Sequence, residues 1–275
     1  MRNTIRQRLI DRIPDINGRV YETDAAAADE DLPYLVLAKG NESEENDWAG
    51  SSYMIEVWPY VAHTLFQRVD KLVSEIISAL DHQLLTDTDT GESILCRFTG
   101  STSADMLDEK SKAITRGIQF EVFSFGWLLH QPIEPDPVSA MSQWTAQRFV
   151  EMQTDPQSWN PSDSSPALYW RTASIRNMQT TNWGAWVDAT LRGHMLVPHV
   201  SARNIWLERC IRQLALDGHM SMLDQSTMFI QKISADSSQD PFRVGQIAID
   251  VRFGLLRTSP DAMKLDQINF IGGAP

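Results

Sequence analysis

The sequence predicts an α+β protein made of two tandem copies of a small domain, in which two helices cover a mixed, mostly antiparallel sheet. Three observations support this fold class. Apolar residues alternate with a period of two in several short runs and recur at helical spacing in others. The order of these runs in residues 1–130 is repeated in residues 131–275. Proline-rich segments at 130–137 and 154–166 interrupt the pattern as linkers or long loops.

In residues 1–130, Ile5, Leu9 and Ile13 mark a short amphipathic helix that ends before Pro14. The strongest helical stripe contains Leu65, Val69, Leu72, Val73, Ile76, Ile77 and Leu80. The expected elements are a helix at 5–13, strands at 33–38 and 51–60, a helix at 62–84, a turn at 87–92, a strand at 93–99, a charged loop at 103–113 and a strand at 116–129.

Residues 131–275 repeat this order. The expected elements are a helix at 138–152, strands at 166–175 and 183–193, a helix at 200–216, and strands at 226–233 and 243–256. A constant offset of 127 positions aligns Arg116, Gln119, Phe120, Val122, Leu128 and Leu129 with Arg243, Gln246, Ile247, Ile249, Leu255 and Leu256. A duplicated domain is therefore expected, with the sheet of each copy covered mainly on one face.

Charge and cysteine content exclude several classes. The 275 residues carry a formal net charge of −12, which argues against a protein that grips nucleic-acid phosphates. Residues 1–130 hold 12 basic and 22 acidic side chains (−10), and residues 131–275 hold 12 and 14 (−2). No apolar run approaches a membrane span, and no secretory signal follows the basic N-terminus. Cys96 and Cys210 lie in separate apolar segments, which predicts buried free thiols.

No catalytic motif emerges from the sequence. Phosphate-binding glycine loops and nucleophile elbows are missing. His194 and His199 flank a strand-to-helix junction, which favours backbone hydrogen bonds over a metal site. The segments 87–92 and 236–241 are typical of turns, and Cys210 falls on an apolar helix stripe, where a thiol is inert. We therefore expect no enzyme activity, no cofactor and no metal.

The composition is unusual in its tryptophan content, with nine residues. Four of them occur where the face of a strand opposite the core is expected: Trp58, Trp170, Trp183 and Trp186. Large aromatic side chains on such a face serve as interface anchors, or else they form a second packed layer between the two repeats. The sequence leaves both explanations open.

One family resembles residues 1–130 in element order and spacing. The matching features are the helix from Ile5 to Ile13, Gly18-Arg19-Val20-Tyr21, an acidic spacer, Pro33-Tyr34-Leu35-Val36-Leu37, the strand 52–58, the helix 62–84 and Gln119-Phe120-Glu121-Val122. These features resemble the tail-completion, or tail-terminator, proteins of long-tailed bacteriophages. Members of that family typically have one such domain, so residues 131–275 fit only through the duplication.

The resemblance implies a structural virion protein of the tail-neck region, made in the host cytoplasm. Such proteins form a six-fold ring that caps the tail tube, ends its polymerisation and joins the tail to the head connector. The implied partners are further copies of the chain, the tail tube protein, a connector or neck protein and, in a tail that has one, the sheath protein, with no membrane. DNA would pass through the ring without binding. Candidate lumen or docking residues are Glu42, Glu44, Glu45, Asp47, Asp105, Asp108 and Glu109.

The unequal charge of the halves favours six chains over three, with one repeat lining the ring. Three alternatives stay open. The first is another neck, connector or baseplate subunit. The second is a small-molecule-binding or enzymatic α/β domain unrelated to phages, and the third is a non-viral adaptor that binds one partner through its tryptophan-rich face.

Overall fold

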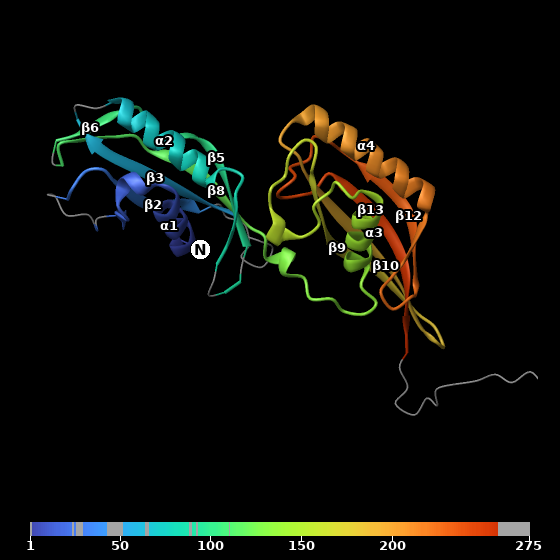
Figure 1. Cartoon of the computed structure of the whole chain (residues 1–275). Helices are drawn as coiled ribbons and strands as arrows, with labels where there is room; N and C mark the ends of the chain where they lie inside the picture. The colour runs from blue at the N-terminus through green and yellow to red at the C-terminus, as the bar shows by residue number, and fades with distance from the viewer. Residues whose placement is uncertain are drawn as a thin grey trace, which may run out of the picture.

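The computed structural model describes residues 2–23, 25, 30–42, 52–63, 66–87, 90–91, 93–109 and 111–257. Within them the chain forms two units that lie side by side, the first coloured blue to green and the second yellow-green to red (Figure 1). Each unit combines a sheet with helices packed on one face of it. The α+β class expected from the sequence is confirmed.

The first unit has a mixed sheet. Its strands follow the order β1-β2-β3-β8-β5-β4, with β1 and β2 parallel and the other neighbours antiparallel. A hairpin of β6 and β7 extends the sheet through pairing of β7 with β3. The elements are α1 (Arg2–Arg12), η1 (Pro14–Ile16), β1 (Val20–Glu22), β2 (Tyr34–Glu42), β3 (Ser52–Ala62), α2 (Phe66–Leu80), β4 (Leu84–Thr86), β5 (Ser93–Ser101), β6 (Met106–Asp108), β7 (Ala113–Thr115) and β8 (Ile118–Ser124).

The second unit has an antiparallel sheet in the order β11-β12-β13-β10-β9. The short 3-10 helix η2 (Gly126–Leu129) precedes the connecting segment between the units. The remaining elements are α3 (Pro137–Arg148), η3 (Pro156–Ser158), β9 (Ala167–Thr180), β10 (Gly184–Leu196), α4 (Val200–Asp217), β11 (His219–Ser221), β12 (Thr227–Ala235) and β13 (Ile247–Leu256).

The two sheets share one strand order. Without β1 and the β6–β7 hairpin, the first sheet runs β2-β3-β8-β5-β4, and the second runs β9-β10-β13-β12-β11 in the same chain sequence. The offset of 127 also aligns two buried pairs in the central strands, Phe120 with Ile247 and Val122 with Ile249. This shared order is what a duplication would produce, and the duplication itself stays a prediction.

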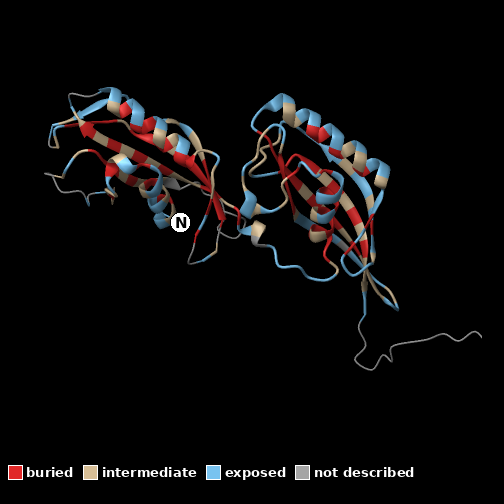
Figure 2. Cartoon of the chain, in the orientation of Figure 1, coloured by how far each residue is buried: buried red, intermediate tan, exposed pale blue. Residues whose placement is uncertain are grey.

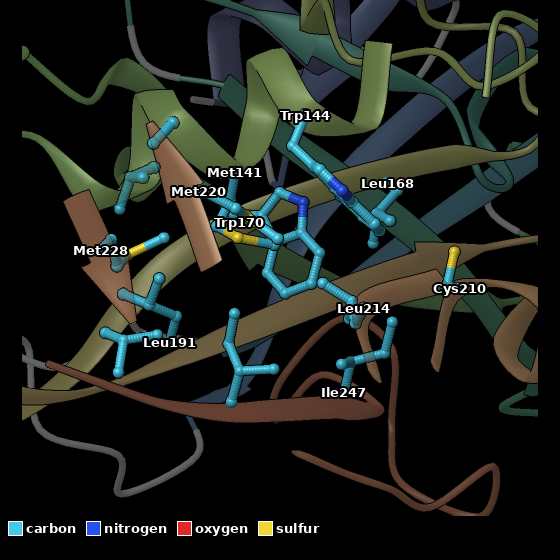
Figure 3. Packing of buried hydrophobic residues seen from close by; sticks show 14 of the residues in the cluster. Met141, Trp144, Leu168, Trp170, Leu191, Cys210, Leu214, Met220, Met228 and Ile247 are labelled. Atoms are coloured by element: carbon cyan, nitrogen blue, oxygen red, sulfur yellow. The ribbon is translucent and has the colours of Figure 1, made fainter. Parts of the chain in front are cut away.

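Each unit has its own core beneath its helices (Figure 2). In the first, Leu72 and Ile76 of α2 join Ile5 and Leu9 of α1 over the sheet. In the second, Cys210 and Leu214 of α4 lie over the sheet, together with Met141 and Trp144 of α3 (Figure 3). The helical stripes at 62–84 and 200–216 therefore face the cores as expected.

Several predicted boundaries are wrong. The helix expected at 62–84 ends at Leu80, because Asp81 leaves the helix and its carboxylate accepts a hydrogen bond from the backbone N–H of Phe98 at 2.8 Å. The charged loop expected at 103–113 contains the β6–β7 hairpin. The strand expected at 116–129 ends at Ser124, so Leu128 and Leu129 lie in η2 and do not correspond to Leu255 and Leu256 of β13.

The strands missing from the sequence prediction are each three residues long: β1, β4, β6, β7 and β11. A run of three residues is too short to carry a period-two signal, and a neighbouring strand supplies the backbone partners that make it extended. None of the helices in the described part of the chain is long and apolar enough to cross a membrane.

Candidate functional site: interaction surfaces

The face of the first sheet that turns away from α1 and α2 is aromatic and apolar on β2 and β3, whereas Arg97 and Glu121 lie on the same face of β5 and β8. Val36 lies opposite Trp58 across β2 and β3, and Tyr34 lies opposite Tyr60. The rings of this tyrosine pair stack with centroids 4.8 Å apart. Glu56, on the same face, accepts a hydrogen bond from Nε1 of Trp58 at 3.0 Å. We call this surface the aromatic face: Tyr34, Val36, Ala38, Met54, Glu56, Trp58 and Tyr60. Most of these side chains are only partly buried, so a partner could cover them.

The corresponding face of the second sheet carries a lattice of ion pairs. Asp188 binds both Nε and Nη2 of Arg252, at 2.6 and 2.8 Å. Asp250 binds Arg176 at 3.0 Å and Thr190 at 2.9 Å. On its described strands this face holds two carboxylates and a surplus of basic residues, and we call it the charged face: Arg171, Arg176, Asp188, Arg192, Lys232, Asp250 and Arg252. At the equivalent strand pairs β2–β3 and β9–β10, the two units thus expose unlike surfaces.

Trp170 does not lie on an outer face, and its assignment as an interface anchor was wrong. It is 3% exposed in the core of the second unit, and its Nε1 donates to Oγ1 of buried Thr145 at 2.9 Å (Figure 3). Gly193 on β10 makes room for the indole, because a Cβ there would lie 2.7 Å from the ring. The hydrogen-bond acceptor on α3 and the space beside β10 therefore turn Trp170 inward.

The other three predicted tryptophans do lie outside the cores. Trp58 is on the aromatic face and Trp186 is on the same side of β10 as Asp188. Trp183, in the turn between β9 and β10, is 42% exposed and packs edge-on against Trp186 at 5.3 Å. Their role as interface anchors stays a prediction.

Strand β9 offers a long free edge. It spans 14 residues at the end of the second sheet and pairs along one side with β10. On the other side, among the described residues, main-chain bonds with Gln153 occupy only its beginning. Ile175 and Met178, further along the strand, are 59% and 56% exposed. An edge of this length with exposed apolar side chains is a template for pairing with another chain.

The acidic candidates divide into three groups. Glu44, Glu45 and Asp47 lie outside the described residues, as does the side chain of Glu42. Asp105 binds Arg116 at 2.7 Å, which holds the pKa of that carboxyl below its usual range; Asp108 accepts a hydrogen bond from Ser111 at 2.7 Å. Glu109 is exposed beside the β6–β7 hairpin. The charge of Asp105 is thus compensated, which weakens its case as a repulsive lumen residue.

The two units meet through a junction that sequence reasoning did not foresee. Glu121, from β8 of the first unit, binds Arg97 at 2.5 Å and also binds Arg243 of the second unit. Arg97 in turn binds Asp240 at 3.0 Å. Phe123 and Phe242 stack across the junction with centroids 5.5 Å apart. Charges and rings from both units therefore hold the halves together, although the connecting segment 130–137 is proline-rich.

His194 lies at the same junction. Its Nδ1 is 2.7 Å from the carbonyl oxygen of Pro241, and its Nε2 accepts a hydrogen bond from Arg171 at 2.9 Å. Burial, with the nearby Arg171 and Arg192, lowers its pKa to about 4. The ring is therefore neutral at pH 7. His199 instead binds Asp163 at 2.6 Å.

The two cysteines and the two turn aspartates lie in the kinds of position that the sequence predicts for them. Burial raises the pKa of both Cys96 and Cys210 to about 12, so neither is a thiolate at neutral pH. Asp87 accepts from the backbone N–H of Thr90 at 3.0 Å, and Asp236 from that of Ser238 at 2.9 Å, as the expected turns require. Within the described ranges, no three His, Cys, Asp or Glu side chains are grouped for a metal ion.

The fold thus defines an α+β protein of two sheet units joined by a polar and aromatic junction. Comparison with known proteins adds no family: no family model matches the chain, and no curated protein matches it. One solved structure without a functional name is 13% identical, with 48% of this chain and 99% of that chain covered and a TM-score of 0.30. A likeness at that level supports no conclusion about function.

Proposed function

We propose that the protein is a structural subunit of a ring that caps the tail tube of a long-tailed bacteriophage, ends tube polymerisation and joins the tail to the head connector. The observation that carries the proposal is the pair of unlike sheet faces. A closed ring with more than two subunits needs two different, complementary surfaces on every copy. The charged face has a basic surplus, whereas residues 1–130 carry a net charge of −10.

The element order of the first unit supports the choice of family, because it follows the order that resembles tail terminators. The net charge of −12 supports the passage of DNA, since like charge repels phosphates within roughly 8 Å at physiological salt. The difference between the aromatic and charged faces supports six chains rather than three. A three-chain ring would have to use both faces in equivalent places, and their chemistry is not equivalent.

The mass and shape of the assembled particle test this proposal. Native mass spectrometry and negative-stain imaging of the purified protein should show a ring of six chains with a central hole. Assembly should weaken at high salt, because the contact between a basic face and an acidic unit is electrostatic. A monomer at all concentrations would overturn the ring, and a three-chain ring would overturn the stoichiometry.

A functional assay is needed to test whether the ring acts at the end of the tail tube. Adding the protein to polymerising tail tube subunits should stop tube growth, so that tube length falls as the protein concentration rises. Nucleation of new tubes would instead indicate a baseplate subunit. No effect on tubes, together with a ring that binds the head connector, would indicate another neck component.

A further inference from the structure

A cavity of about 310 Å³ lies at the junction between the two units. Its walls come from both: His82 belongs to the first unit, and Trp159, Arg203 and Phe242 belong to the second. Three prolines, two aliphatic residues and the amides Gln83 and Asn160 also line it. The volume is at the small end of the range of small-molecule sites, about 300–1,000 Å³.

The aromatic walls are held in place by contacts with residues of both units. Nε1 of Trp159 donates to the carbonyl oxygen of His82 at 3.0 Å, and its ring stacks on Tyr169 with an interplanar angle of 7°. Phe242 stacks on Phe123 of the first unit. A flat apolar ligand would therefore meet rigid surfaces, which lowers the entropic cost of binding.

Arg203 supplies the positive charge of the cavity. It projects from the first turn of α4, and its Nε is buried with no hydrogen-bond partner. A buried N–H donor without an acceptor is unfavourable, and a carboxylate bound beside the guanidinium would offset that cost through its charge. No Asp or Glu is among the described residues that line the cavity. The imidazole of His82 already has Asp81 as a partner at 3.0 Å.

We propose that this cavity binds a small planar molecule that bears one carboxylate, with the carboxylate on Arg203 and the apolar ring between Trp159 and the prolines. One guanidinium balances one negative charge, whereas a phosphate monoester would bring up to two charges into a pocket that compensates one. The site is independent of the ring proposed above, because it lies within a single chain.

A groove between α1 and α2 is also lined by arginines. It holds Arg8 and Arg12 on one side, in a volume of about 510 Å³. Glu75 lines the same groove and already provides a carboxylate there. Arg8 is also engaged, since its Nε donates to the carbonyl oxygen of Ala79 at 3.1 Å. The junction cavity is therefore a better anion site than this groove.

Titration of the whole chain with sodium benzoate tests the proposal. Nuclear magnetic resonance of arginine Nε–Hε groups should show a saturable shift of Arg203, with smaller shifts of the indole N–H of Trp159. Arg203→Met should raise the dissociation constant about tenfold or more, which is the effect of losing a hydrogen bond to a charged group. Arg203→Lys should give an intermediate value, because the charge remains and the forked geometry is lost.

The matched control is Arg212→Met, on the same helix, where the exposed side chain pairs with Glu208. Its benzoate affinity should equal that of the unchanged protein. Benzamide, a neutral analogue of the same shape, and phenyl phosphate should each bind at least about tenfold more weakly. Equal binding of benzamide would overturn the role of charge, and tighter binding of phenyl phosphate would overturn the preference for a carboxylate. Shifts that do not saturate, or that miss Arg203 in the unchanged protein, would overturn the site.

Discussion

Arg243 of the second unit donates a hydrogen bond to the carboxylate of Glu121 in the first unit, although the two residues are 122 positions apart. The carboxylate is nearly buried, and its other oxygen binds Arg97. A carboxylate between two guanidinium groups is stabilised only while both remain in place. The ion pairs therefore make the relative position of the units part of the folded structure.

Glu121→Gln should destabilise the protein by about 1–3 kcal/mol, because the buried acceptor loses its charge while two arginines keep theirs. Urea unfolding followed by fluorescence and by circular dichroism is the measurement. We also expect the unfolding curves from the two probes to stop coinciding, because the two units would unfold in separate transitions once the ion pairs between them are weakened. Glu208→Gln, in an exposed pair with Arg212, is the control and should change stability by at most about 0.5 kcal/mol.

Gly193→Ala should destabilise the second unit by about 1–3 kcal/mol, because the new Cβ would lie 2.7 Å from the ring of Trp170. Gly126→Ala is the control, since the nearest atom to its new Cβ is 3.9 Å away. A double variant with Trp170→Leu tests the cause. The cost of the alanine should fall when the indole is absent, and a strictly additive cycle would show that the two positions do not interact.

Stability should fall as the pH decreases from about 6.5 to about 4, and His194 should account for part of the loss. Its folded pKa of about 4 lies below the usual 6.5, so the unfolded chain binds the proton first in this window. Each unit of pKa difference corresponds to about 1.4 kcal/mol, which gives a total of roughly 3–4 kcal/mol. Carboxylates titrate in the same pH range. The difference in the free energy of unfolding between the unchanged protein and His194→Gln, followed against pH, therefore isolates the contribution of the histidine. Identical pH profiles would contradict the shift.

Ile175→Lys should weaken self-association if the free edge of β9 carries a contact between copies. The side chain is 59% exposed, so the monomer should change in stability by no more than about 0.5 kcal/mol. Sedimentation velocity should show a shift from rings to smaller species. Phe66→Lys, which replaces an exposed residue of α2 in the first unit, should leave assembly intact. Equal assembly of both variants would exclude β9 as the contact.

Neither cysteine should react with Ellman's reagent in the folded protein at pH 8. Both thiols are buried, with pKa values raised to about 12, and the thiolate is the reactive form. Two equivalents should react after unfolding in guanidinium chloride. Rapid labelling of Cys210 under native conditions would mean that α4 opens from the sheet.

The periodic patterns predicted the long helices and strands well. An element that buries one face must carry apolar residues at the period of its own backbone, and this repeat can be read from the sequence. The stripe through Leu72 and Ile76 gave α2, and the stripe through Cys210 and Leu214 gave α4. The same patterns could not orient Trp170. Leu168, Tyr169 and Trp170 are consecutive large side chains on alternate faces of β9, so the local sequence fits either orientation.

The junction and its cavity left no signal in the sequence. Arg97, Glu121 and Arg243 look like ordinary surface charges until the units pack, and His82 is 77 positions from Trp159. No motif connects residues at such separations, because their contacts are created by the packing of two sheets rather than by local spacing. The sequence predicted some residues of the aromatic and charged faces but not their full sets, because the pairing between strands decides which side chains share a surface.

The sequence by itself determined the α+β class, the repeated order of elements, the net charge of −12 and the burial of both thiols. These properties follow from composition and from periodicity within single elements. Only the tertiary structure decided that Trp170 turns inward, that Glu121 binds Arg243, and that Arg203 faces a cavity between the units. Those outcomes depend on which distant strands and helices meet, and that choice is made by the whole chain minimising buried unpaired groups and empty space.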